Sequence, residues 1–260
     1  MGTKQTFLYL GKKASVVSSL TFLLLLAQPC AANDSSVSVA LPLVSNNCIS
    51  QDSVTTANPY CQVNTMYEEA MALSDKAKRT EKLNAAVEVI NSYLIDCPNS
   101  VKGLVLASEI YRARGGRSYA IQYNEKAKNI LKKYIIESND MHAMLNYAIL
   151  CSAGDDRYTA ESDDSRELGK KQAEIIVQLC QKQLNDNTDN KVKQRLSETL
   201  AIAYLVLGDK KQCNEYLKTS SSSWLDVFEN TVLKETWLWP VSRADNVEKE
   251  FLLYYLKLSD

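Results

Sequence analysis

The chain has 260 residues, with 30 basic and 31 acidic side chains and a formal net charge of −1 at pH 7. This balance excludes proteins that bind nucleic acid through charge, because those concentrate a basic excess on one face to meet the phosphates. Eight glycines and five prolines occur, too few for an all-β fold of this length. We therefore expect an all-α protein that binds no nucleic acid.

The first residues have the composition of a cleavable export signal. Three lysines and no acid precede Ala14–Ala27, an uncharged run that a glutamine and a proline follow. The run is shorter than the roughly twenty apolar residues that span a bilayer, and small residues precede Asn33, as signal peptidase requires. We expect cleavage of residues 1–32, which leaves a periplasmic or secreted protein without stable membrane insertion. A lipid on Cys30 is the alternative, but its preceding residues match a lipoprotein signal poorly.

Six cysteines follow the predicted cleavage point, and export permits them to form disulfides. Cys48 and Cys61 flank a polar stretch without a helical pattern, where a short bridge would compensate for the absence of a core. We expect a disulfide between these two residues. The other four lie in helical patterns, where a buried free thiol and a bridge are both open alternatives: Cys97, Cys151, Cys180 and Cys213.

Residues 33–65 are rich in Ser, Asn and Thr and contain Pro42 and Pro59, which predicts an extended arm or linker. After Met66, apolar residues recur at intervals of three and four, which predicts helices. We expect these helices at Tyr67–Arg79, Lys82–Ile95, Ser100–Arg114, Ser118–Ser138, Met141–Ser152, Ser165–Leu184, Asn190–Leu207, Lys210–Lys218, Ser221–Lys234 and Arg243–Lys257.

A pattern of small, aromatic and glycine positions recurs along these helices. Ser74, Ala77, Glu81, Ala86, Tyr93 and Pro98 are matched thirty-four residues later by Ser108, Tyr111, Gly115, Ala120, Ala127 and Lys132, and a third copy fits Ala201, Tyr204, Gly208, Cys213 and Ser220. The spacing resembles the tetratricopeptide repeat over residues 66–220. This resemblance implies a solenoid of helix pairs, in which small residues allow close approach, the aromatic residue fills the wedge between repeats, and glycine ends the first helix in a left-handed cap. The pattern is broken where Lys132–Ile136 replaces the closing proline and where Asp155–Asp164 is inserted between two helices.

Residues 221–260 differ in composition because bulky aromatic side chains gather there. A solenoid exposes the apolar face of its last repeat, so we expect these residues to form a C-terminal pair of capping helices. An aromatic ligand pocket and a membrane-surface anchor are the alternatives. The aromatic residues are Trp224, Phe228, Trp237, Trp239, Phe251, Tyr254 and Tyr255.

The sequence carries no motif that predicts an enzyme, a cofactor or a metal. The single histidine, His142, follows Asn139 and Asp140 at the start of a predicted helix, and we expect it to be a partly exposed first-turn residue. Asp155–Asp164 offers carboxylates, but it lacks the alternating ligands and central glycine of a calcium loop. A phosphate loop, a dinucleotide fingerprint and a zinc-binding histidine pair are all missing from the sequence.

Resemblance to tetratricopeptide proteins places ligand-facing side chains on the concave side of the first helix of each repeat. Charged residues there could clamp a peptide carboxylate or pair with a partner helix. The predicted partner-binding residues are Glu68, Asp75, Lys78, Arg79, Lys102, Glu109 and Arg112. A solvated helix face of mixed charge is the alternative interpretation of the same residues.

We therefore expect an exported scaffold, periplasmic in a Gram-negative bacterium, that holds a protein or peptide in a concave groove without turnover. Its partners would belong to an envelope, secretion or transport assembly. The alternative is a small-ligand-binding accessory protein of a periplasmic uptake system, with its pocket among the C-terminal aromatic residues.

Overall fold

The computed structural model describes residues 58–154, 161–234 and 247–259. Three of the predicted features lie outside these ranges: the export signal, Cys48, and the arm up to residue 57. Most of the acidic insertion, at 155–160, and the tryptophans at 237 and 239 lie outside them as well. Within the described ranges every regular segment is helical, as the sequence predicts.

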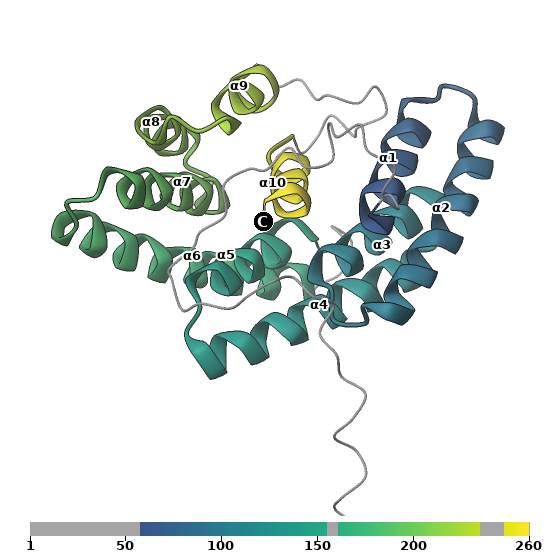
Figure 1. The fold of residues 1–260 in the computed structure, drawn as a ribbon, viewed down its shortest axis with the longest axis horizontal. Helices are drawn as coiled ribbons and strands as arrows, with labels where there is room; N and C mark the ends of the chain where they lie inside the picture. The colour runs from purple at the N-terminus through teal and green to yellow at the C-terminus, as the bar shows by residue number, and fades with distance from the viewer. Residues whose placement is uncertain (1–57, 155–160, 235–246, 260) are drawn as a thin grey trace, which may run out of the picture. The chain divides into compact units, whose positions relative to one another are not determined.

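The described helices follow one another as antiparallel pairs (Figure 1). Five-residue π-helical segments continue the chain after α5 and α9, so the helices predicted at Met141–Ser152 and Ser221–Lys234 are each divided in two. The pairs are α1 (Pro59–Ala72) with α2 (Lys76–Asp96), α3 (Val101–Arg114) with α4 (Arg117–Ser138), α5 (Met141–Ile149) and η1 (Leu150–Gly154) with α6 (Glu161–Asp186), and α7 (Asn190–Leu207) with α8 (Lys210–Ser220). The remaining segments are α9 (Trp224–Phe228), η2 (Glu229–Leu233) and α10 (Val247–Leu258).

Local caps set the ends of the first helix in the second and fourth pairs. Asp189 accepts a hydrogen bond from the backbone N–H of Lys191 at 2.8 Å and starts α7. Gly208 ends α7 with φ 88°, and Gly115 ends α3 with φ 96°. Side chains with a Cβ disfavour this left-handed region. The predicted left-handed glycine caps are therefore confirmed at both positions.

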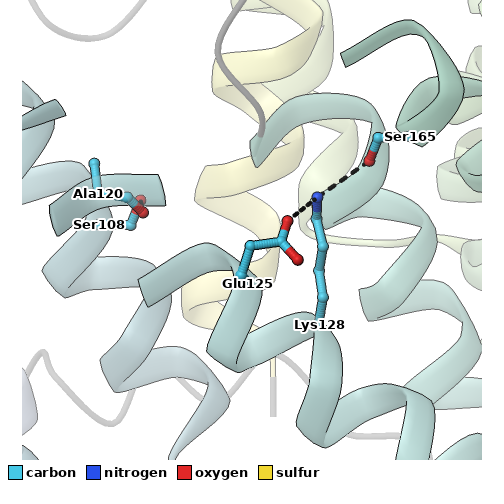
Figure 2. Close-up of polar contacts among 5 residues, drawn as sticks. All are labelled: Ser108, Ala120, Glu125, Lys128 and Ser165. Carbon is cyan, nitrogen blue, oxygen red and sulfur yellow. Dashed lines mark hydrogen bonds and ion pairs between the residues drawn. The ribbon is translucent and has the colours of Figure 1, made fainter. Parts of the chain in front are cut away.

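Small and aromatic residues join the two helices of a pair. The repeat pattern implies the contact of the small residue, whereas it placed the aromatic residue between repeats. Ser108 of α3 donates a hydrogen bond from Oγ to the carbonyl oxygen of Ala120 of α4 at 2.8 Å (Figure 2). Tyr111 stacks on Tyr123 with ring centroids 5.5 Å apart. The fourth pair repeats this contact, because Tyr204 stacks on Tyr216 at the same centroid distance of 5.5 Å.

The first predicted copy of the repeat is out of register. Helix α1 begins at Pro59, inside the segment expected to be extended, because Asn58 caps it and proline suits the first helical turn. The chain turns at Ser74, and Asp75 caps α2 by accepting hydrogen bonds from two backbone N–H groups. Ser74 therefore lies between helices, whereas its predicted equivalent, Ser108, lies inside α3.

A buried lysine joins the second pair to the third. The side chain of Lys128, on α4, is 4% exposed, and its Nζ lies 3.1 Å from Glu125 Oε1 and 3.1 Å from Ser165 Oγ on α6 (Figure 2). A charged side chain away from water needs such partners. The contact gives α4 and α6 a fixed relative register.

The described cysteines behave in two ways. Cys151, Cys180 and Cys213 are buried thiols that form no disulfide, so of the two alternatives left open for them the structure supports the small core residue. Burial raises the pKa of Cys180 to about 12, and it also raises the pKa of Cys213. Cys61 and Cys97 are not among the free thiols. The predicted bridge from Cys61 to Cys48 stays a prediction because Cys48 lies outside the described residues.

Candidate functional site

The C-terminal helix α10 is buried on nearly every side. Phe251 is 0% exposed, Leu252 3%, Tyr255 5% and Leu256 1%. These residues cover more than one face, because neighbours in a helix are about 100° apart. Glutamates in its first turn and Lys257 in its last turn suit the helix dipole. Helix α10, yellow in Figure 1, therefore has protein around it and not only on one side.

Aromatic side chains join α10 to α9. Trp224 lies with its ring centroid 5.9 Å from that of Phe251 and 5.0 Å from that of Tyr255. Phe228 meets Phe251 edge to face at 5.6 Å. Trp224 is 3% exposed and Phe228 is 0% exposed, so these rings fill space among themselves. Their packing supplies no support for an aromatic ligand pocket.

Helix α10 also contacts helices far from it in sequence. Its neighbours include α3, α5, η1 and α7 as well as η2, and Tyr60 of α1 donates a hydrogen bond from its hydroxyl to the carbonyl oxygen of Lys257 at 2.9 Å. A helix that only capped the last repeat would touch the fourth pair alone. We call the sides of α1, α3, α5 and α7 that contact α10 the α10-binding face.

One polar contact of this face is a buried ion pair. Lys257 Nζ pairs with Glu109 of α3, and the two side chains are only 1% and 7% exposed. The ammonium also lies 5.0 Å from the ring centroid of Tyr67, where the negative face of the ring attracts a cation. Lys257 thus joins α10 to α1 and α3 at one point.

A second polar contact joins α10 to α7. The Tyr255 hydroxyl donates to Glu198 Oε1 at 3.3 Å, and the Ser222 hydroxyl donates to Glu198 Oε2 at 2.7 Å. Burial raises the pKa of Glu198, and the two hydrogen bonds lower it and so offset part of that rise. Burial also raises the pKa of Tyr255 well above its ordinary value, and the negative charge of Glu198 and the hydrogen bond to it raise the pKa further.

Acidic groups predominate around Lys257. Burial raises the pKa of Glu68, and the Lys257 ammonium opposes that rise. The pKa of Tyr67 is raised by burial first and then by the charges of Glu109 and Glu250, whereas Arg112 lowers it. Lys257 of α10 is therefore held among several carboxylates where it meets this part of the α10-binding face.

The structure divides the predicted partner-binding residues into two groups. Glu68, Glu109 and Arg112 share the electrostatic surroundings of Tyr67 on the α10-binding face. The others lie elsewhere. Asp75 is the exposed cap of α2, Lys78 is exposed, Arg79 donates to the carbonyl oxygen of Leu73 at the turn, and Lys102 lies half-buried in the first turn of α3.

Sequence reasoning missed the polar contacts that hold α10. Lys257 of α10 and Glu198 of α7 were not candidates, and Tyr255 was considered only as one of the C-terminal aromatic residues, although one signal was available. A lone lysine within the apolar run Phe251–Leu258 predicts a buried cation that needs an acidic partner. Its partner, 148 residues away, could not be chosen from the sequence.

Two further expectations from the sequence concern His142 and metal-binding side chains. His142 lies half-buried in the first turn of α5, as predicted, and its Nδ1 is 3.4 Å from Asn146 Nδ2. No group of three metal-binding side chains occurs in the ranges that the structure covers. None of the helices placed there is long and apolar enough to cross a membrane.

Comparison with family models, curated proteins and solved structures finds no match for this chain. The contacts of the α10-binding face are therefore the observations that bear on its function.

Proposed function

We propose that this protein is an exported tetratricopeptide-like scaffold that binds a protein or peptide without turning it over. The observation that carries the proposal is α10 itself. Side chains from the first helices of successive pairs surround it, and they hold it by apolar packing, a buried ion pair and a hydrogen bond to a carboxylate. A surface that binds one helix in this way has the chemistry needed to bind another.

The site favours binding over catalysis. Glu109, which is buried, and Glu198, which is half-buried, are each already engaged by a side chain of α10. Catalytic acids and bases need access to a substrate. The export signal and the envelope, secretion or transport setting of the partner remain parts of this proposal.

Capture of the partner tests the proposal. The full chain would be produced in its own cell, cross-linked in its own compartment and purified, and the captured proteins identified by mass spectrometry. We expect one partner that is enriched from wild type and from Lys133→Ala, an exposed change on α4. The same partner should be depleted with Glu109→Gln. The scaffold proposal fails if wild type captures nothing that an unrelated exported protein does not also capture.

A further inference from the structure

We infer that α10 is an internal ligand of its binding face, and that the partner is a largely apolar helix with a lysine and aromatic side chains that takes the place of α10. This inference rests on the proposed function and names the chemistry of its partner. The bound α10 serves as the template, since it shows which side chains the face accepts.

The first argument is the position of α10 relative to the helix pairs. The other long helices pack chiefly against their neighbours in sequence, as repeat helices do. In contrast, α10 has polar contacts with α1, α3 and α7, and the hydrogen bond from Tyr60 spans 197 residues. This is the arrangement of a helix bound in a groove, with the ligand supplied by the same chain.

The second argument is the nature of the contacts. Burying two charges has a large desolvation cost, and well-packed apolar residues often stabilise a protein as much as a buried ion pair does. Lys257 and Glu109 are almost fully buried as a pair. In coiled coils a single buried polar contact sets the register and the partner of a helix at a cost in stability. Glu109 therefore selects for a helix with a cation at this position.

The third argument is the charge that remains on the face without α10. Near Lys257 and Tyr255 the face contributes Glu68, Glu109 and Glu198 to the surroundings of α10, and Arg112 is the cation that acts on neighbouring Tyr67. At the other end of α10, Lys210 of α8 pairs with Glu248 at 2.6 Å, so the acidic excess belongs to the Lys257 end alone. An acidic helix would meet like charges there, whereas a lysine would restore the contact made by Lys257. The expected ligand is therefore a helix that carries a cation and not an anion at this point.

A peptide of residues 247–259, labelled with fluorescein, tests this inference by fluorescence anisotropy with the full chain. In wild type the tethered α10 competes at a high effective concentration, on the order of millimolar, so we expect weak binding. Lys257→Met weakens the tethered helix and leaves Glu109 for the peptide lysine. We expect at least about tenfold tighter binding to this variant, because unpairing a buried charge is strongly unfavourable.

Two controls make the result specific. A peptide with methionine in place of its lysine should bind Lys257→Met at least about tenfold more weakly than the native peptide. With Glu109→Gln added to that variant, the two peptides should bind equally. If Lys257→Met does not fold by circular dichroism, Tyr255→Phe, which removes only the hydroxyl that reaches Glu198, serves as the weakened variant.

Four outcomes would overturn the inference. The first is no binding of the native peptide to either folded variant. The second is equal binding of the lysine and methionine peptides to Lys257→Met. The third is exchange of α10 between two copies, seen as a stable dimer by light scattering, since the ligand would then be a second copy of this chain. The fourth is a captured partner that the peptide does not displace. That result would contradict the inference about α10 but not the proposed scaffold function. Capture of no partner would contradict the scaffold function itself.

Discussion

Replacing Lys257 by methionine gives the sharpest test of how α10 is held. The change keeps the length of the side chain but leaves Glu109, whose side chain is 7% exposed, buried without its cation. Breaking a buried ion pair on one side costs about 3–5 kcal/mol. For a protein of this size that corresponds to a fall in Tm of roughly 6–20 °C. Urea unfolding followed by far-UV circular dichroism measures the free energy of unfolding directly.

The double variant Lys257→Met with Glu109→Leu separates the ion pair from general packing. Because both charges are removed together, we expect it to recover most of the lost stability, to within about 1 kcal/mol of wild type. Lys133→Met is the matched control. Lys133 pairs with Glu137 at 3.9 Å on the exposed side of α4, and losing such a pair costs about 0.5 kcal/mol or less. A cost below about 1 kcal/mol for Lys257→Met would refute the reasoning, since a buried charge would then have found water.

Three further predictions concern separate parts of the fold. Gly208→Ala should destabilise the chain by about 1–2 kcal/mol in urea, because φ is 88° there. Cys151, Cys180 and Cys213 should react with a maleimide at pH 8 only after denaturation, since they are buried and the Cys180 pKa is about 12. Burial raises the pKa of Glu198 in the folded protein above the ordinary 4.5. The Glu198 carboxyl therefore contributes less to the free energy of unfolding as the pH rises from 4.5 through its pKa in the folded protein. Glu198→Gln should therefore gain stability relative to wild type over that pH window in urea titrations.

Each of these predictions has an opposing result. Equal unfolding midpoints for Gly208→Ala and wild type would contradict the left-handed cap, and rapid labelling of the native thiols would contradict their burial. A difference between Glu198→Gln and wild type that is independent of pH would contradict the raised pKa.

Helix positions were predictable where a cap stands in the sequence. Asn190–Leu207 matches α7 at both ends because Asp189 and Gly208 are both strong boundary residues. Helix α1 was missed at its start, because Asn58 and Pro59 follow a polar stretch in which a proline indicated an extended chain. The π-helical turns after α5 and α9 were not predicted, since the sequence pattern there reads as ordinary helix.

The candidate site was predictable on one side only. Resemblance to a repeat family selected Glu68, Glu109 and Arg112, which share the surroundings of Tyr67. It also selected Asp75 and Arg79, which cap a helix and close a turn. Local spacing cannot separate these groups, because the difference depends on where α10 packs. That packing joins residues 148 positions apart and leaves no periodic trace in the sequence.

The hydrogen bond between Tyr60 and Lys257 has a consequence for the order of folding. It joins the first described helix to the last across 197 residues, so it cannot form before the ribosome has made almost the whole chain. Contacts of such separation are slow to form because the intervening loop must close first. A nascent chain can pair its early helices as they emerge, but the acidic face that receives Lys257 stays open until residue 257 has been made.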